Sequence, residues 1–370
     1  MKDYVIGVDI GTGSLKALAV NASGVVLSSE QGSYPLLQES EDRCEQDPEL
    51  IWQAFLSCIT NLVKALDESP RAIVLSSAMH SLILVDEHNH PLTSIITWAD
   101  NRAAEIAARI HRSAAGEMLY EQTGTPIHAM SPLCKITWFR ENHEEIFNQT
   151  SRFISLKEFF WFRLFGAYEV DYSTASAKGL MDIESLQWNP NALTLAGITE
   201  ARLGKLVNTN HTRTDLDPSF ARKTGIDPAT PFIIGASDGC MANLGSFATT
   251  QGIAALTIGT SGAVRVASTR PVFNFSAMTF NYRLDAETYI SGGPTNNGGV
   301  VLKWYAENFL GKKLTSADDY RVLLSKVRTI APGADGLIFL PYILGERAPL
   351  WKSDAAGVFF GLRRHHTQDH

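Results

Sequence analysis

The feature that most constrains this chain is a short motif that occurs twice. In VDIGTGSLKALAV, residues 8–20, and in LTIGTSGAVRVAS, residues 256–268, an apolar run enters a Gly/Thr/Ser turn and a second apolar run leaves it. The two copies align on Ile-Gly-Thr, and their spacing predicts a β-hairpin in each. The repeat therefore predicts two domains with a boundary near residues 245–252, which we set as 1–247 and 248–370. Chance similarity between common strand and turn residues is the alternative.

Length and composition favour a globular protein that binds a small molecule. A chain of 370 residues exceeds the size at which one core keeps growing, which also predicts two domains. Its 45% hydrophobic and 19% charged residues are typical of a globular fold. A net charge of -7, with no Lys/Arg cluster that resembles a groove for a nucleic-acid backbone, argues against nucleic acid as a partner.

The sequence has no pattern of a secretory signal or of a membrane span. The most apolar helical stretch, FISLKEFFWFRLFG, is too short to cross a bilayer and contains Lys157, Glu158 and Arg163. We therefore expect a cytoplasmic protein without a membrane partner. Widely spaced cysteines without a C-x-x-C pair favour buried thiols over a zinc or redox site. They are Cys44, Cys58, Cys134 and Cys240.

The first thirty residues predict three consecutive antiparallel strands, at 4–10, 14–20 and 25–30. This arrangement excludes a dinucleotide-binding fingerprint, because that motif opens a helix and Lys16 occupies the position of its third glycine. A Walker A motif does not occur in the sequence either.

The next segments alternate between helix and strand, which predicts an α/β layer fold. Asp47 before Pro48 predicts the capped start of a helix that runs to residue 66. A buried strand is expected at 72–78, and PFIIGASDGC at 231–240 predicts a strand that ends in an exposed turn. Further helices are expected at 103–110, 135–146 and 157–165.

The two hairpin turns have the composition of anion-binding sites. Successive backbone N–H groups in a glycine-rich turn form a concave anion site, to which Thr and Ser hydroxyls add donors. Asp9 beside the first turn would repel an anion directly, so we expect it to act through the water shell of a magnesium ion. The alternative is that Gly11, Gly13, Gly259 and Gly262 only permit tight turns.

Several motifs together resemble the FGGY carbohydrate kinases, which have the actin/hexokinase-like (ribonuclease H-like) two-domain ATPase fold. MSPLCKITWFREN, residues 130–142, fits the first signature of the family, and GVFFGL, residues 357–362, opens the second. The motifs SSAMHS, ITWADNRA, GASDG, GGPTNNGG and GERAPLW are most similar to those of gluconate kinases, with xylulose kinases as near relatives. Family members continue beyond residue 370, so the resemblance implies an incomplete second domain that lacks the adenosine motif.

The resemblance implies a role for particular residues. Asp238 is expected to be the catalytic base, since a carboxylate at a strand end can lie within hydrogen-bond reach of a substrate hydroxyl. An ordinary Asp-Gly turn is the alternative. The magnesium ion is expected at Asp9, through water, and at Asp238. The residues expected to bind ATP are Gly11, Thr12, Gly13, Ser14, Lys16, Gly259, Thr260, Ser261, Gly299 and Lys303.

The residues expected to bind the sugar are Met79, His80, Trp98, Asp100, Arg102, His128 and Asp171. Arg102 could bind a substrate carboxylate in a bidentate manner, or it could be a surface residue beside a helix-capping Asp100. His128 and Asp171 could equally satisfy backbone groups, and Lys303 could be a solvated helix residue. Arg347 is expected to be structural and to brace the cleft.

The resulting hypothesis is ATP-dependent phosphorylation of D-gluconate to 6-phospho-D-gluconate, with Mg²⁺. A kinase for xylulose or another polyol or ketose is one alternative. A truncated remnant that binds sugar without catalysis is another, since a partial sequence, a shortened gene product and a defective paralog all fit the ending. Activity of the 370-residue chain and formation of a homodimer stay open at this point.

Overall fold

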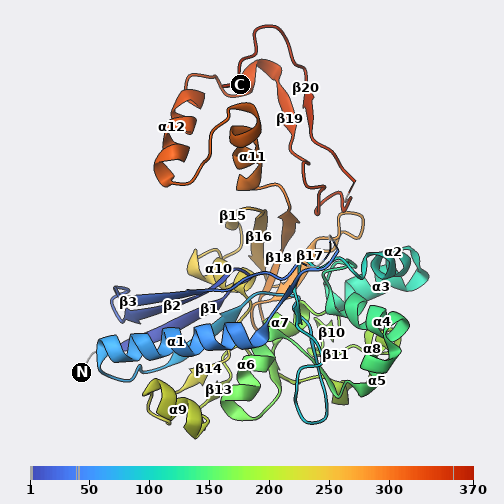
Figure 1. Ribbon diagram of the computed structural model, residues 1–370. Helices are drawn as coiled ribbons and strands as arrows, with labels where there is room; N and C mark the ends of the chain where they lie inside the picture. The colour runs from blue at the N-terminus through green and yellow to red at the C-terminus, as the bar shows by residue number, and fades with distance from the viewer. Residues whose placement is uncertain (1–2, 39, 41, 353) are drawn as a thin grey trace. The chain divides into compact units, whose positions relative to one another are not determined.

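The computed structural model describes residues 3–38, 40, 42–352 and 354–370 (Figure 1). Its internal contacts divide the chain into two compact units. Unit 1 consists of Met1–Ile253, Val266–Phe275 and Phe280–Ser291. Unit 2 consists of Ala254–Arg265, Ser276–Thr279 and Gly292–His370.

The core of unit 1 is a mixed six-stranded sheet in the order β13-β14-β5-β1-β2-β3. The strands β1, β2 and β3 are antiparallel neighbours, whereas β5 runs parallel to β1, and β14 runs parallel to β5. The three strands predicted for the first thirty residues are confirmed, with the third shifted to begin at Val26. The bounds are β1 Tyr4–Ile10, β2 Ser14–Asn21, β3 Val26–Ser33, β5 Ile73–Ser77, β13 Thr212–Arg213 and β14 Phe232–Ile233.

Helix α1, Pro48–Leu66, covers one face of this sheet beside β2 and β3 (Figure 1). The Asp47 side chain accepts the N–H of Glu49, and proline occupies the first helical turn, as the sequence predicts. Its buried residues recur at helical spacing, and Phe55 is fully buried among aromatic rings that include Phe160. Burial of this stripe fixes the helix against the sheet.

Helix α6 is confirmed at Leu156–Phe165, where Ser155 and Glu158 form a reciprocal capping box. The single helix predicted at 135–146 is wrong in one respect. It is broken at His143, whose φ of −142° is not helical, so that α4, Pro132–Asn142, and α5, Glu144–Gln149, are separate. The other helices of unit 1 are α2 Ala104–Arg112, α3 Ala114–Thr123, α7 Tyr172–Ser176, α8 Pro190–Ala196, the 3₁₀ turn Glu200–Arg202, α9 Pro218–Thr224 and α10 Asp238–Gly245.

Short strand pairs connect these helices. Strand β4 pairs with β7, β6 with β8, β9 with β12, and β10 with β11. Their bounds are β4 Glu45–Gln46, β6 Ile83–Val85, β7 Ile95–Ile96, β8 Arg152–Ile154, β9 Glu169–Asp171, β10 Met181–Asp182, β11 Gln187–Trp188 and β12 Lys205–Val207.

The second predicted hairpin is confirmed as β15, Ala254–Ile258, and β16, Gly262–Ser268. It belongs to a four-stranded sheet in the order β15-β16-β18-β17, with β17 at Phe280–Arg283 and β18 at Tyr289–Thr295. The remaining elements are α11 Gly299–Phe309, α12 Ala317–Val327, the 3₁₀ turn Ala334–Gly336, β19 Ile338–Leu340 and β20 Val358–Phe360. Among the described residues, no helix has the length and apolar character needed to cross a membrane.

Candidate active site

Met79 and His80, expected to bind sugar, and Asp238, expected to act as base, follow strands β5 and β14, which lie side by side in the unit 1 sheet. The Ala78 N–H after β5 donates to Ile10 O at the end of β1, at 2.9 Å. Ser77 also forms a parallel bridge with Ser237, which follows β14. The carboxyl ends of parallel strands are the usual ligand-binding edge of an open α/β sheet. The sheet therefore brings the segments after β1, β5 and β14 together.

Asp9 is exposed near the end of β1 and lies opposite Lys16 of β2 in the strand register. The Ser76 hydroxyl of the neighbouring strand donates to Asp9 Oδ1 at 3.3 Å. In the turn that follows, Gly11 O accepts the Tyr34 hydroxyl at 2.6 Å. Burial, and then the charge of Asp9, raise the pKa of Tyr34, so this hydroxyl stays protonated and continues to donate.

Thr12 connects the first hairpin turn to an expected sugar-binding residue. The indole N–H of Trp98 donates to Thr12 Oγ1 at 2.9 Å. The Gln46 amide donates to Thr12 O at 2.6 Å. The structure therefore brings together Thr12, expected to bind ATP, and Trp98, expected to bind sugar, although neither role follows from this contact alone.

Asp100 and Arg102 form a buried ion pair, so the alternative of a surface arginine beside a helix cap is wrong. Arg102 Nε and Nη2 donate to the two carboxylate oxygens of Asp100, each at 2.7 Å. Arg102 Nη2 also donates to Glu45. Helix α2 begins at Ala104 without a side-chain cap. Burial alone would lower the pKa of Arg102, but the bonds to Asp100 and Glu45 raise it. Because Nε and Nη2 are engaged in these bonds, a substrate carboxylate would have to bind through Nη1.

His80 is buried, in a left-handed backbone conformation with φ of 61°, and both of its ring nitrogens have protein partners. Nδ1 lies 2.7 Å from Ala177 O, which can only accept, so Nδ1 carries a proton. Nε2 lies 3.1 Å from the hydroxyl of Tyr282, which sequence analysis did not single out. A sugar hydroxyl would compete with Tyr282 for Nε2 of His80. The neighbouring Met79 is half-buried.

Lys135 is a second residue that sequence analysis missed. It lies on α4 and is fully buried, and its ammonium donates to His80 O at 3.0 Å and to Thr97 O at 2.6 Å. Burial lowers the pKa of Lys135 to about 7. The available signal was a lysine inside the apolar run PLCKITWF, which predicts an amine buried for a specific contact.

His128 and Asp171 satisfy backbone groups. His128 Nδ1 accepts the Met130 N–H at 3.2 Å. Asp171 is fully buried, caps α7 by accepting the Thr174 N–H at 2.8 Å, and pairs with Lys157 at 2.8 Å. We therefore assign Asp171 to the support of the fold in place of the expected sugar contact, because both of its oxygens are engaged inside the protein.

Asp238 is the first residue of α10 and is partly exposed. Its Oδ1 accepts the N–H of Gly239 at 2.7 Å. The expectation of an exposed turn here is wrong, because Ile234 to Ser237 are buried and the helix starts directly after them. A carboxylate at a helix N-terminus is stabilised in its charged form by the helix dipole.

In unit 2, the second hairpin turn contacts the start of α11. Gly298 N donates to Thr260 O at 3.2 Å, and Gly299 N donates to Gly259 O at 2.6 Å. A Cβ at Gly298 would lie 2.5 Å from Ser261 O, so the close approach requires glycine there. Lys303 is exposed and faces Glu307 at 3.9 Å.

Arg347 braces a turn within unit 2, and its expected role at the cleft stays a prediction. Its Nε donates to Asn296 Oδ1 at 2.8 Å, and its Nη2 donates to Thr295 O at 3.1 Å.

The residues of unit 1 fit a magnesium ion bound chiefly through water and phosphate. Among the described residues, no group of three or more Asp, Glu, His or Cys side chains could hold a metal ion. Magnesium in phosphoryl-transfer sites is usually held by one or two carboxylates and by the phosphates, so an exposed Asp9 suits it.

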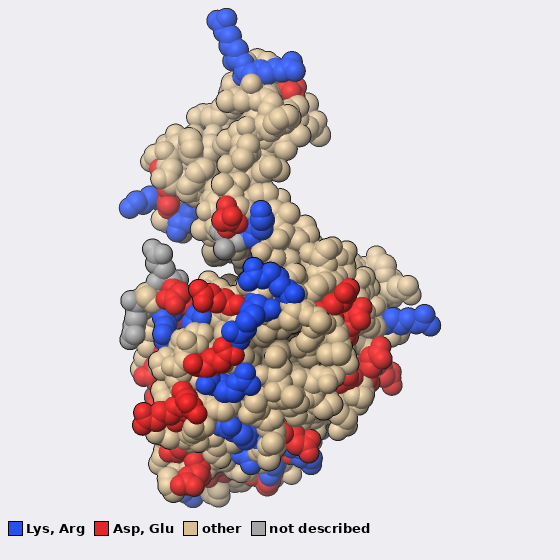
Figure 2. Space-filling model, turned by 90° about the vertical axis from the view of Figure 1, so that its right-hand side faces the viewer, with Lys and Arg blue, Asp and Glu red and all other residues tan. Residues whose placement is uncertain are grey.

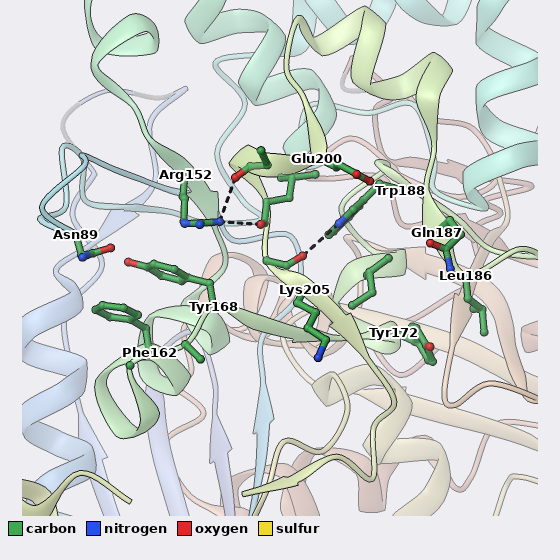
Figure 3. Close-up of a pocket in the computed structure, with 16 residues that line it drawn as sticks. Asn89, Arg152, Phe162, Tyr168, Tyr172, Leu186, Gln187, Trp188, Glu200 and Lys205 are labelled. Atoms are coloured by element: carbon green, nitrogen blue, oxygen red, sulfur yellow. Dashed lines mark hydrogen bonds between the residues drawn. The ribbon is translucent and has the colours of Figure 1, made fainter. Parts of the chain in front are cut away.

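A separate groove of unit 1, with a volume of about 910 Å³, contains none of the expected site residues (Figure 3). It is lined by Tyr168 and Trp188 among others, and Arg152 there donates to the backbone oxygens of Ala201 and Leu203. The guanidinium of Arg152 is thus used to hold the protein backbone, while Lys205 also lines the groove.

Comparisons with known proteins settle the family. Residues 4–245 match the N-terminal domain, and residues 254–370 the C-terminal domain, of the FGGY family of carbohydrate kinases. The chain belongs to this family. It is therefore a phosphotransferase that uses ATP and has an alcohol group of a sugar-type substrate as acceptor, with the actin/hexokinase-like two-domain fold.

The similar proteins include kinases for a sugar acid and for a ketose. A gluconokinase from Bacillus licheniformis is 44% identical over all of this chain and 73% of its own length. A xylulose kinase from Lactococcus lactis is 30% identical over 99% of this chain and 73% of its own length. The crystal structure of gluconate kinase from Lactobacillus acidophilus has a TM-score of 0.93 at 35% identity, over 99% of this chain and 74% of that one.

Proposed function

We propose that this kinase phosphorylates D-gluconate to 6-phospho-D-gluconate, with Asp238 as general base. The observation that carries the proposal is the position of Asp238 at the start of α10, next to the segment that follows β5. The 44% identity to a gluconokinase supports gluconate as the substrate. We keep a cytoplasmic location as part of the proposal. On the face drawn in Figure 2, acidic and basic side chains are interspersed, which suits a small-molecule substrate.

In the proposed reaction, Asp238 accepts the proton of the terminal substrate hydroxyl while that oxygen attacks the γ-phosphorus of ATP. The bond between the γ-phosphorus and the β,γ-bridging oxygen breaks, and ADP leaves. Little covalent chemistry is asked of the protein, so positioning of the hydroxyl carries most of the effect. Trp98 would offer an apolar face to substrate C–H groups, and Met79 would contact the chain of the polyol.

The hairpin turns are proposed to bind phosphate oxygens. The N–H groups of Gly11 and Gly259 donate within their own turns, to Ser14 O at 3.1 Å and Ser261 O at 2.8 Å. The donors proposed for phosphate are therefore the N–H groups of Thr12–Gly13 and Thr260–Ser261, with hydroxyls beside them. Asp9 would hold a water molecule on a magnesium ion, which would neutralise phosphate charge when bound.

An ADP-release assay with D-gluconate, D-xylulose and neutral polyols tests the substrate. We expect the highest kcat/KM with D-gluconate. A higher value with D-xylulose would assign the protein to the ketose kinases that are also similar to it. If calorimetry shows gluconate binding but no acceptor leads to ADP release from ATP, the protein binds sugar without catalysis.

Recognition of the substrate carboxylate is tested by Arg102→Leu. We expect a larger loss of kcat/KM for gluconate than for neutral polyols, because the guanidinium is the cation proposed to face the acid. Arg109→Leu is the control, since Arg109 is exposed and pairs with Glu141 on the surface. Equal losses for acids and polyols would remove Arg102 from carboxylate recognition and leave it with its structural bonds to Asp100.

A further inference from the structure

A buried ion pair lies behind the turn that carries Asp238. Lys157 Nζ is 2.8 Å from Asp171 Oδ2, and the two side chains are 1% and 0% exposed. Burying two charges is costly, and removing one partner leaves the other uncompensated. The proposed chemistry gives this pair no direct part, because neither side chain reaches the protein surface.

Lys157 holds the turn from one side. The same ammonium donates to Ala236 O at 2.8 Å. Ala236 lies two residues before Asp238, so the orientation of its peptide group helps to set where the helix α10 begins. A lysine ammonium has three donors, and two of them are thus committed to Asp171 and to this carbonyl.

Asp171 holds the same turn from a second side. Its Oδ1 accepts the N–H of Thr174 and so fixes the start of α7. Ser173, in the first turn of α7, accepts the N–H of Ser237 through its hydroxyl at 3.1 Å, and the two hydroxyls lie 2.7 Å apart. Ser237 directly precedes Asp238, so both anchors of the turn depend on Asp171.

The backbone of this turn needs such anchors. Gly235 has φ of +66°, and a Cβ built there would lie 1.9 Å from Leu75 O of strand β5. The turn is therefore pressed against the sheet in a conformation that only glycine adopts readily. The residues that follow Gly235 are held by the hydrogen bonds of Ala236 O with Lys157 and of Ser237 N with Ser173.

We propose that Lys157 and Asp171 are positioning residues for Asp238, acting through Ala236 and Ser237. This inference rests on the proposed role of Asp238 as base. It also gives Asp171 a function that is different from the sugar contact expected from the sequence. Positioning of this kind affects the chemical step, because a shift of about 1 Å in a reacting group can cost about 10²-fold in rate.

Lys157→Met tests the inference in the full-length protein. We expect kcat to fall by about 10²-fold, with KM for gluconate within about threefold of the wild type. Lys178→Met is the matched control, since Lys178 forms another buried ion pair, 2.6 Å from Glu158 of the same helix α6, without a bond to the Asp238 turn. We expect kcat of the control to stay within about threefold. Equal kcat losses in both variants would overturn the positioning role.

A second variant guards against a failure to fold. Lys157→Met combined with Asp171→Asn removes both charges, so that no unpaired charge stays buried. The Ala236 carbonyl still loses its donor, and we expect kcat to stay low. A kcat within about threefold of the wild type in this double variant would overturn the inference.

Hydrogen exchange of the segment 234–241 provides a readout without turnover. We expect faster amide exchange there in Lys157→Met than in Lys178→Met, because only the first loses an anchor of the turn. Unchanged exchange would overturn the inference whatever the activity. A wild-type protein that releases no ADP with any sugar would instead overturn the proposed function, and the exchange result would still decide the anchoring.

Discussion

The two units differ in how their proposed ligand-binding segments are supported. In unit 1, buried side chains hold these segments, as Lys135 does for the carbonyls of His80 and Thr97. In unit 2, the turn at Gly259–Ser261 is supported by backbone contacts with Gly298 and Gly299. In unit 2 the carbonyls of Gly259 and Thr260 accept these bonds, so the turn is held without a side-chain contact from Gly298 or Gly299.

The apolar core of unit 1 is also larger than the described apolar cluster of unit 2. Unit 1 has a continuous core in which Phe55 is fully buried. The described cluster of unit 2 consists of Ala306, Leu314 and Leu323, while Phe360 of β20 is 67% exposed. The larger described apolar core is therefore that of unit 1.

The largest expected effect compares one phenylalanine from each unit. Phe55→Ala removes a ring from a packed aromatic cluster and should lower the free energy of unfolding by about 3–5 kcal/mol. Phe360→Ala removes an exposed ring and should change it by no more than about 0.5 kcal/mol. Denaturant unfolding measures both, and similar losses would show that the two cores do not differ as described.

A smaller effect concerns the buried lysine of unit 1. The pKa of Lys135 is about 7 in the folded protein and about 10.4 in an unfolded chain. Between these values the unfolded chain binds more protons, so the free energy of unfolding rises with pH by up to about 1.4 kcal/mol per unit. Below pH 7 the full cost of burying the ammonium is present.

Lys135→Met should remove this dependence. From pH 7 to about 8.5, the free energy of unfolding of the wild type should therefore rise relative to that of the variant. This pH range lies below the titration of most lysines. Lys64→Met, at an exposed position of α1, should show no such change. Parallel pH profiles for Lys135→Met and the wild type would mean that burial does not lower the pKa of Lys135.

The smallest expected effect compares glycines near the two turns. Gly298→Ala would place a Cβ against Ser261 O and should raise KM for ATP by about tenfold, with KM for gluconate unchanged. Gly13→Ala meets no atom within 4 Å, so it should leave stability unchanged and raise KM for ATP less. An unaltered KM for ATP in Gly298→Ala would contradict the proposed role of the second turn.

Local patterns predicted the elements that depend on local chemistry. The two hairpins, the Asp47 cap and helix α6 follow from turn residues, capping residues and apolar spacing. The break at His143 escaped prediction, because the apolar and polar pattern continues through it.

Long-range pairing accounts for what the sequence did not reveal about the candidate site. Arg102 and Asp100 could be singled out as a constellation, and their mutual pairing is local, but Glu45 as the third partner depends on the contact of distant segments. The burial of Asp171 against Lys157 has the same origin. A carboxylate looks alike in a sequence whether it faces a ligand or a buried lysine.

The most direct test of the central claim is Asp238→Asn in the full-length protein, measured by gluconate calorimetry and ADP release. The amide keeps an oxygen for the N–H of Gly239 but loses the negative charge and, with it, the capacity to accept the substrate proton. We predict that kcat falls by about 10²- to 10⁴-fold while gluconate affinity is retained. Undiminished ADP release from the variant would contradict the account.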